Sequence, residues 1–313
     1  MSSESLNGIL ITGSSGQVGG ELVRAFTPLA QRFGSVHAPL RADLNLSDPD
    51  SIRRAVRTLR PRWILNPAAY TAVDRAESEP ELAYQINAEA VRVLGEEAAR
   101  LGSAVVHFST DYVFDGTCDR PYTEQDATSP INLYGASKLA GEQALADSGT
   151  AHIILRTSWV YSASGHNFLR TVLRYARERS QMTIVNDQHG SPTWSRELAR
   201  VALAIVQRCE AGRSAHGPEQ KVRAFEGVYH ATCAGETTWF GFARQALALA
   251  RVRNPNANFA ELVPVNTSDY PTLASRPVNS LLNSEKLEAT FDIRTMHWQA
   301  ALAQVIEEFE LLA

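Results

Sequence analysis

Short, almost wholly apolar runs alternate with longer amphipathic stretches through the first half of the chain. The apolar runs read GILITG (8–13), SVHAPL (35–40), WILN (63–66), AVVHFST (104–110) and HIILRTSWVY (152–161). Runs this short and this continuous are typical of parallel strands that are buried on both faces of a sheet. We therefore predict five strands in this order.

Between these runs, apolar residues recur at the spacing of a helix. Helices are predicted over 17–26, over a segment with Ser47 as N-cap and Pro49 in the first turn, over 80–102, and from YGASKLAGEQAL (134–145). Strands that alternate with helices of this length indicate an α/β fold, a doubly wound parallel sheet with helices on both faces.

After about residue 160 the alternation loosens and the elements become smaller. Helices are predicted over 167–179, 195–209, 237–252 and 298–312, strands over 182–187 and 228–232, and a polar loop over 211–220. We expect a doubly wound Rossmann-type domain over 1–160. Residues 161–313 should mainly form a smaller α/β lobe, with the chain crossing back to the first domain.

Composition and charge narrow the range of partners. The 313 residues carry a formal net charge of -4 and no long basic run, which argues against nucleic acid or an anionic membrane as a partner. The three cysteines are scattered without metal-ligand spacing, as expected of free thiols in a reducing compartment. The polar start MSSESLNG and the absence of a long apolar run predict a cytoplasmic protein.

A glycine-rich stretch, TGSSGQVGG, follows the first predicted strand and leads into the first predicted helix. It places Gly13, Gly16 and Gly19 where a tight turn, a close backbone approach and close helix–strand packing are needed. The helix N-terminus then offers N–H groups to a pyrophosphate. This context predicts dinucleotide binding, although the glycine spacing is one residue longer than in G-x-G-x-x-G.

The second predicted strand ends in HAPLRADL, without the carboxylate that commonly binds the adenosine ribose. Arg41 lies just beyond this strand, and a cation at this place favours NADP over NAD. The alternative is that Arg41 is simply exposed to solvent. We therefore expect NADPH or NADH as the cofactor, with NADPH slightly favoured.

A tyrosine and a lysine four residues apart, Tyr134 and Lys138, share one face of a predicted helix. The pair is either an ordinary helix surface or a catalytic acid whose pKa is lowered by a neighbouring cation. Ser109, Thr110 and Asp111 end the fourth strand, at the sheet edge where α/β proteins bind ligands. A hydroxyl, a phenol and an ammonium at that edge indicate reduction of a carbonyl by hydride from the cofactor.

Several long stretches resemble the extended short-chain dehydrogenase/reductase family, and in particular its sugar-nucleotide reductases. They include VVHFSTDYVFDGT, YTEQDATSPINLYGASKLAGE, RTSWVYSASGHNF, NDQHGSPTW and YPTLASRPVNSLLNSEKL. The resemblance implies hydride transfer to the keto carbon at position 4 of dTDP-4-dehydro-6-deoxy-L-mannose, which gives dTDP-L-rhamnose.

The resemblance also implies site residues. Tyr134 would donate the proton, Lys138 would lower its pKa and bind the nicotinamide ribose, and Thr110 would bond to the keto oxygen. The expected cofactor contacts, with those of the glycine loop and Arg41, are Gly13, Gly16, Gln17, Val18, Gly19, Arg41, Asp43, Leu44, Ala69, Tyr70, Thr71, Tyr134 and Lys138. The expected substrate contacts are Thr110, Asp111, Trp159 and Arg276, with Asn66 as a further candidate.

Some positions depart from the pattern of the family. Pro67 stands where an alanine is more usual, and Glu21 is present while Arg196 and Gln299 replace the other glutamates of relatives that form metal-linked dimers. We therefore expect no metal, and a monomer or weak homodimer. His107 inside the fourth strand is predicted to be a core residue rather than a base.

Two other functions remain open. A nucleotide-sugar epimerase or dehydratase would share the fold and the Tyr134–Lys138 pair, and Asp111 directly after Thr110 suits a dehydratase. A non-catalytic regulatory subunit resembling that of methionine adenosyltransferase would keep the fold without turnover. Trp239 and Trp298 are predicted to be core residues.

Overall fold

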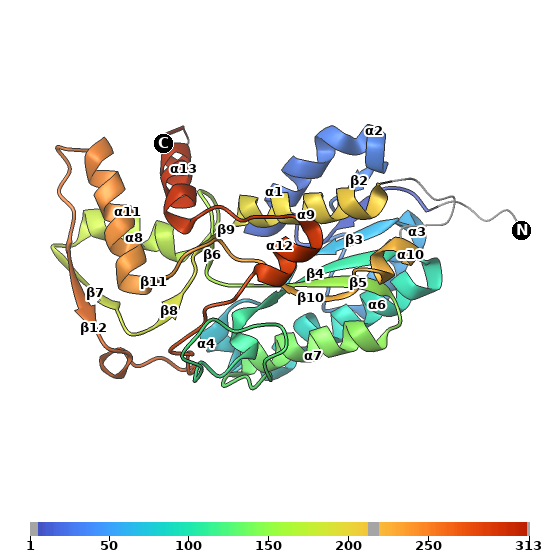
Figure 1. The fold of residues 1–313 in the computed structure, drawn as a ribbon, viewed down its shortest axis with the longest axis horizontal. Helices are drawn as coiled ribbons and strands as arrows, with labels where there is room; N and C mark the ends of the chain where they lie inside the picture. Colours follow the sequence, from blue (N-terminus) through green and yellow to red (C-terminus); the bar gives the residue numbers. More distant parts are fainter. Residues whose placement is uncertain (1–5, 212–218, 312–313) are drawn as a thin grey trace, which may run out of the picture.

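A six-stranded parallel sheet with helices on both faces forms one end of the molecule, and a smaller lobe of helices and short strands forms the other (Figure 1). The computed structural model describes residues 6–211 and 219–311. The strands lie in the order β2-β1-β3-β4-β5-β10. Their bounds are β1 Ile9–Ile11, β2 Val36–His37, β3 Trp63–Asn66, β4 Ala104–Thr110, β5 Ala151–Thr157 and β10 Gly227–His230.

Alternate strand residues pack into two separate hydrophobic cores, one on each face of the sheet. One core joins Ile11 and Leu65 to helices α1 (Gln17–Phe26), α9 (Ser195–Glu210) and α12 (Glu285–Phe291). The other joins neighbouring strand positions to helices α3 (Pro49–Leu59), α6 (Ala90–Leu101) and α7 (Leu133–Asp147). The prediction of a doubly wound parallel sheet is thus confirmed, and the near-continuous apolar strands reflect burial on both faces.

Helix α3 corrects one predicted cap. The N-cap is Asp48, whose side chain accepts a hydrogen bond from Asp50 N at 2.9 Å. The Ser47 hydroxyl instead donates to Asn45 Oδ1 at 2.8 Å in the preceding turn. Both residue types are good caps, so the sequence alone did not distinguish these neighbours.

The helix predicted over 80–102 is interrupted by a wider turn. Helix α5 (Pro80–Tyr84) passes through a π-helical turn (Gln85–Glu89) into α6, which ends at Gly102 with φ 72°. The π turn contains Asn87, whose Oδ1 accepts from Tyr70 N at 2.8 Å and whose Nδ2 donates to Ser137 Oγ at 2.9 Å. The extra residue of the turn therefore serves to connect the loop after β3 to α7.

The second half of the chain contributes to both parts of the molecule. Helix α9 packs on α1, α10 (Glu219–Arg223) lies against β5, and β10 pairs in parallel with β5. Helix α12 was not predicted, and residues 212–218 of the loop predicted over 211–220 lie outside the described residues.

The smaller lobe is built from three two-stranded sheets and three longer helices. The paired strands are β6 (Val160–Tyr161) with β9 (Thr193–Trp194), β7 (Gln181–Val185) with β12 (Glu261–Val265), and β8 (His189–Gly190) with β11 (Thr237–Thr238). The helices are α8 (Phe168–Glu178), α11 (Trp239–Arg253) and α13 (Trp298–Leu311). β12 was missed, and the single strand predicted over 152–161 is two strands, because the backbone turns at Trp159 with φ 46°.

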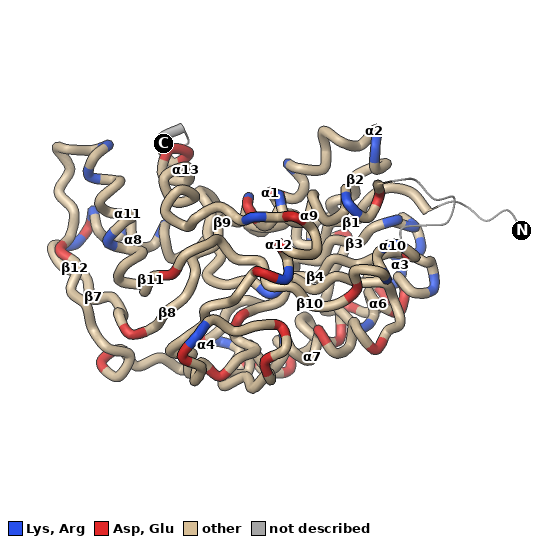
Figure 2. The backbone as a smooth tube through the Cα atoms, viewed as in Figure 1, with Lys and Arg blue, Asp and Glu red and all other residues tan. Residues whose placement is uncertain are grey.

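The shortest segments connect these elements. They comprise α2 (Ala30–Phe33), α4 (Val73–Ala76) and the 3₁₀ turns Thr27–Leu29, Asp111–Val113 and Thr267–Asp269. Lys and Arg are interspersed with Asp and Glu along the outer helices (Figure 2). Among the described residues, no helix is both long and apolar enough to cross a membrane.

Candidate active site

A cavity of about 650 Å³ lies where the carboxyl ends of β1, β3, β4 and β5 meet the smaller lobe. In parallel sheets this edge, at the point where the strand order reverses, is the usual ligand site. Twelve of the residues predicted from sequence line it. They are Gly13, Gly16, Gln17, Val18, Gly19, Ala69, Thr71, Thr110, Asp111, Tyr134, Lys138 and Trp159.

The glycine loop forms the cavity wall at the end of β1. Gly13 has φ +56°, and its carbonyl oxygen accepts from Gly16 N at 2.9 Å, which closes a tight turn. A Cβ on Gly19 would lie 2.0 Å from that oxygen, so only glycine allows α1 to pack this close. Helix α1 begins at Gln17 beside the cavity, and the side chain of Gln17 accepts from Ser162 Oγ and Asn167 Nδ2, both at 2.9 Å. The loop is thus suited to a diphosphate and fastened to the smaller lobe.

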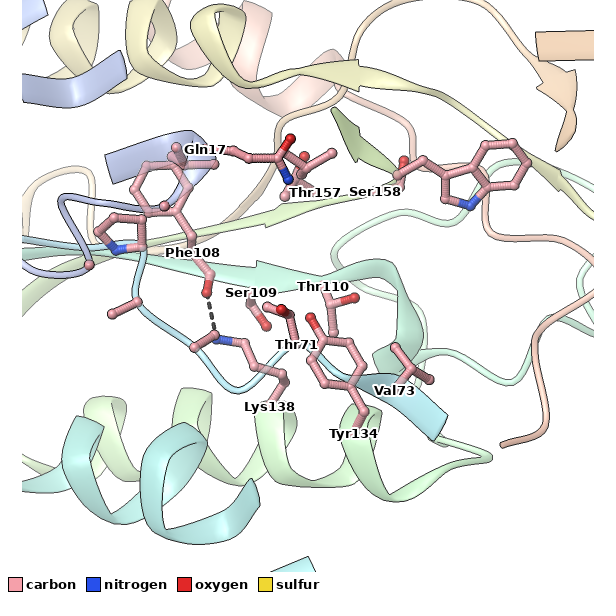
Figure 3. A pocket seen from close by; sticks show the side chains of 18 of the residues that line it. Gln17, Thr71, Val73, Phe108, Ser109, Thr110, Tyr134, Lys138, Thr157 and Ser158 are labelled. Carbon is pink, nitrogen blue, oxygen red and sulfur yellow. Dashed lines mark hydrogen bonds between the residues drawn. The ribbon is translucent and has the colours of Figure 1, made fainter. Parts of the chain in front are cut away.

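Strand β4 and helix α7 bring Thr110, Tyr134 and Lys138 together. β4 ends at Thr110, and α7 starts at Leu133 with Asn132 as its N-cap, whose side chain accepts from Gly135 N at 2.7 Å. The phenol of Tyr134 reaches from α7 toward the Ser109 and Thr110 side chains, and Lys138 extends from the next turn (Figure 3).

Tyr134 is half-buried, and its hydroxyl lies beside groups that affect its proton in opposite directions. Burial raises its pKa to about 12, a hydrogen bond with Thr110 lowers it, and the nearby Asp111 carboxyl raises it. The sequence predicted that Lys138 would lower this pKa, and that effect stays a prediction. The Lys138 ammonium donates to Phe108 O at 2.6 Å and contacts the ring of His107.

Lys138 is itself a buried cation, with 1% of its surface exposed. Burial lowers its pKa to about 8, and the negative charge of Glu142 one turn further along α7 raises it. His107 is fully buried, as predicted for a core residue, and its two ring nitrogens contact Lys138 Nζ at 3.2 Å and Asn66 Nδ2 at 3.0 Å. Burial, followed by the charge of Lys138, holds the pKa of His107 well below its usual range.

Asp111 is another buried ionisable group of the cavity. Its Oδ1 accepts from Thr110 Oγ1 at 2.9 Å. Burial raises its pKa to about 7, while hydrogen bonds from Ser280 and Thr110 lower it. The carboxyl is therefore divided between its charged and neutral forms near neutral pH.

The smaller lobe provides an aromatic wall. Trp159 stacks on Trp239 with ring centroids 3.6 Å apart and planes 9° from parallel. Gly190 lies under the Trp159 ring, where a Cβ would come within 2.5 Å of Cε2. Trp239 packs against the core of the smaller lobe, as predicted, but it is only partly buried and also lines the cavity. Trp298 is buried in the lobe, as predicted.

Six predicted contacts do not line the cavity. Asn66 is buried at the end of β3, where its Nδ2 lies 3.0 Å from His107 Nδ1. Arg41 and Asp43 are exposed beyond β2, and Leu44 is buried in the core beside α3. The Tyr70 hydroxyl donates to Glu79 Oε2 at 2.6 Å. Arg276 donates to Asp74 Oδ2 at 2.7 Å and to Ala274 O at 3.2 Å.

Other cavity residues were not among the predicted contacts. They are Ser15, Pro67, Ala68, Val73, Phe108, Ser109, Tyr112, Thr157, Ser158, Val160, Gly165, His166 and Trp239. Most lie in the glycine loop or at or just beyond the carboxyl end of a strand, so their chain positions could have indicated them. Trp239 could not have been found this way, because it reaches the cavity from the first turn of α11.

Glu21, the one glutamate present of those considered for a metal-linked dimer, forms an ion pair within the protein. Arg196 Nε donates to Glu21 Oε2 at 2.9 Å and Arg196 Nη2 to Glu308 Oε2 at 3.0 Å, whereas Gln299 is exposed. Within residues 6–211 and 219–311, no cluster of three or more His, Cys, Asp or Glu side chains is placed to hold a metal ion.

The amino-acid sequence is similar to those of known reductases along nearly its whole length. Residues 7–311 match the family described as the RmlD substrate binding domain. The chain is 45% identical over 306 residues to a dTDP-4-dehydrorhamnose reductase of Burkholderia thailandensis, covering 96% of this chain and 98% of that protein. It is 43% identical over 301 residues to that of Salmonella typhimurium, covering 96% and 97%.

A solved structure agrees as well. The Bacillus anthracis dTDP-4-dehydrorhamnose reductase, crystallised in complex with NADP, has a TM-score of 0.86 and 31% identity, covering 97% of this chain and 100% of that one. The family match spans nearly all of the described fold, including every cavity wall. The chain therefore belongs to the RmlD substrate-binding-domain family.

Proposed function

We propose that this protein is an NADPH-dependent dTDP-4-dehydrorhamnose reductase that converts dTDP-4-dehydro-6-deoxy-L-mannose to dTDP-L-rhamnose. Relatives at 45% and 43% identity carry this name, and a related structure binds NADP. The observation that carries the proposal is one cavity lined by the glycine loop, Thr110, Tyr134 and Lys138.

The cavity residues fit a dinucleotide. The close contact of Gly19 with the Gly13 carbonyl and the start of α1 at Gln17 leave backbone N–H groups available to a diphosphate. When bound, a reduced nicotinamide supplies the hydride. Arg41 is exposed beyond β2, where a cation suits the additional phosphate of NADP.

The chain itself provides the proton and the orientation. The high pKa of Tyr134 keeps the phenol protonated until negative charge develops on the keto oxygen, to which the proton is then transferred. Thr110 hydrogen-bonds to the same oxygen and holds the phenol in place. Lys138 contributes positive charge from below the site, and Asp111 and Trp159 would contact the sugar nucleotide.

The proposal extends to the organisation of the protein. Residues 1–160 would mainly bind the cofactor, and residues 161–313 mainly the sugar nucleotide. We propose a monomer or weak homodimer that acts in the cytoplasm and binds neither nucleic acid nor membranes. Sedimentation over a range of protein concentrations would test the assembly state.

The test is oxidation of NADPH and of NADH, followed by absorbance, with dTDP-4-dehydrorhamnose as substrate. We expect net consumption of cofactor, and a kcat about 10²–10⁴-fold lower in Tyr134→Phe. Tyr84→Phe, on the exposed tyrosine of α5, is the control and should match the wild type. An epimerase or dehydratase would turn over without net loss of NADPH, and a regulatory subunit would bind NADPH without turnover; either result would contradict the proposal.

Cofactor choice has its own test. Arg41→Ala should raise the KM for NADPH several-fold and leave that for NADH unchanged, because only NADPH carries the additional phosphate. An equal change in the KM for NADPH and for NADH would show that Arg41 does not bind the additional phosphate.

A further inference from the structure

A chain of buried hydrogen bonds runs behind the cavity from the glycine loop to Lys138. Thr12 Oγ1 lies 2.6 Å from Asn66 Oδ1, Asn66 Nδ2 lies 3.0 Å from His107 Nδ1, and His107 Nε2 lies 3.2 Å from Lys138 Nζ. Each of the four residues has at most 1% of its surface exposed. This hydrogen-bonded series connects the ends of β1, β3 and β4 to α7, and all four of its side chains are buried from solvent.

The donor and acceptor roles along this hydrogen-bonded series depend on one another, because a group that donates requires an acceptor at the next residue. A charged lysine only donates, and a neutral imidazole has one donor and one acceptor nitrogen. If the Asn66 amide nitrogen faced His107 Nδ1, the ring proton would be on Nε2 and would point at the Lys138 ammonium. A half-turn of the Asn66 amide keeps both of its contacts and removes this conflict, since amide oxygen and nitrogen are interchangeable in shape.

The charges around Lys138 decide which arrangement holds. His107 is kept neutral by its burial and by Lys138, and His152 on β5 acts in the same direction. The Lys138 pKa of about 8 leaves the amine mostly protonated at neutral pH. Glu142 on α7 supports this charge, although it is itself bonded to Arg156 of β5, with Nη2 to Oε2 at 2.6 Å.

We propose that His107 is a positioning residue that accepts a hydrogen bond at Nε2 from the Lys138 ammonium, with its proton held on Nδ1 by the Asn66 carbonyl oxygen. Asn66 Nδ2 then donates to Thr12 Oγ1. With Phe108 O as the second acceptor, the ammonium is fixed in direction and its charged form is stabilised inside the protein. The effect on turnover rests on the proposed function, whereas the hydrogen-bond arrangement does not.

Two amide substitutions at His107 test its contact with Lys138 separately from its contact with Asn66. The amide of His107→Gln reaches the position of Nε2 and retains an acceptor for Lys138, whereas that of His107→Asn reaches only the position of Nδ1. A bond to a charged amine is roughly twice as strong as one to a neutral amine, so its loss favours deprotonation. We expect the alkaline limb of the pH profile of kcat/KM to move down by about one pH unit in His107→Asn and by at most a few tenths in His107→Gln.

His230→Asn is the matched control. His230 is also fully buried, but it lies on β10 outside the cavity and contacts Tyr122 O and Asn283 O. Its replacement measures the general cost of removing a buried imidazole and should leave the pH profile unchanged. Equal shifts in both His107 variants, or no shift in either, would reduce His107 to a core residue and overturn the proposal.

The wild-type protein gives an independent measurement. In ¹⁵N-histidine-labelled protein, the His107 resonances should show the proton on Nδ1 at pH 6 to 7, both with and without added NADPH. A proton on Nε2 in this range would overturn the proposal even if neither His107 variant folds. This readout needs no turnover, so failure of the proposed function and failure of the hydrogen-bond arrangement are distinguishable.

Discussion

The two walls of the cavity are made in different ways. On the inner wall, Thr110 and Lys138 belong to a seven-residue strand and a fifteen-residue helix, and both are at least 95% buried. On the outer wall, Trp159 and Trp239 come from a sharp turn and a helix start, are only partly buried, and support each other by stacking.

This difference indicates a division of labour between rate and selectivity. The inner wall holds the groups that are proposed to exchange protons, and they cannot move without disturbing the sheet. The outer wall presents flat apolar surface whose position depends on a few contacts inside the smaller lobe. We therefore expect changes on the inner wall to affect kcat and changes on the outer wall to affect the KM of the sugar nucleotide.

The strongest test of this comparison is Lys138→Met. It should lower kcat about 10²–10³-fold, because the charge beneath the site is lost. The melting temperature should change by only a few degrees, since an apolar side chain of similar volume replaces a buried cation. Lys286→Met, at a partly buried lysine bonded to Val228 O outside the cavity, is the control. A large loss of stability with normal kcat would contradict the division.

Gly190→Ala should act on the outer wall alone. The added Cβ would approach the Trp159 ring to 2.5 Å and force it to move. We expect the KM for the sugar nucleotide to rise about tenfold, or about 1.4 kcal/mol, with kcat within twofold of the wild type. In Gly20→Ala the new Cβ has only an ordinary contact, with Ser14 O at 3.6 Å, so this control should leave the KM unchanged. A fall in kcat with unchanged KM would place Trp159 with the chemistry.

Trp239→Leu should have a smaller effect of the same kind. It removes the ring stacked on Trp159 at 3.6 Å without placing an atom in the cavity. An aromatic pair contributes about 0.5–1.5 kcal/mol beyond its buried area, which corresponds to a KM increase of roughly two- to tenfold. Trp239→Phe should show an intermediate value. Identical kinetics in all three proteins would mean that Trp159 does not need this support.

The smallest effect concerns Asp111, where the inner wall meets the sugar-binding side. Its pKa of about 7 in the folded protein lies above the ordinary value of 3.8, so folding favours the protonated carboxyl. The resulting stability is complete below about pH 4, declines as the pH rises, and is lost once the pH passes about 7. Relative to Asp111→Asn, the wild-type melting temperature should therefore fall by a few degrees between pH 4.5 and 7.5. Parallel curves would show that Asp111 is already charged at low pH.

The same contrast explains what the sequence could predict. β4 and the start of α7 were identified because a continuous apolar strand and a Tyr–Lys pair at helical spacing are local patterns. The outer wall depends on contacts between distant segments, since Trp159, Gly190 and Trp239 are brought together only by the smaller lobe. The fold class was thus predictable, whereas the Trp159–Trp239 stack was not.

The hydrogen-bond partners of the charged groups in the cavity could not be predicted from the sequence either. The spacing of Tyr134 and Lys138 placed both residues on one helix face, but it did not show that the ammonium contacts the backbone carbonyl of Phe108 and the ring of His107. Neither partner could be foreseen, because the direction of a strand residue relative to the helix after a long loop is set by packing. The site residues carried over from the family remain predictions for the experiments above.

The return of the chain to the large sheet has a consequence for protein engineering. β10 pairs with β5 and α12 packs on α9, so residues well beyond 160 complete the hydrophobic core of the cofactor side. A chimaera that exchanges everything after residue 160 with a relative would therefore replace the outer wall of the cavity. It would also replace half of the residues of the core that α1, α9 and α12 form with the sheet. Recombination of substrate preference should instead exchange three separate segments, around 160–194, 237–265 and 298–311, because α13 shares the core of the smaller lobe, and should leave the segments between them in place.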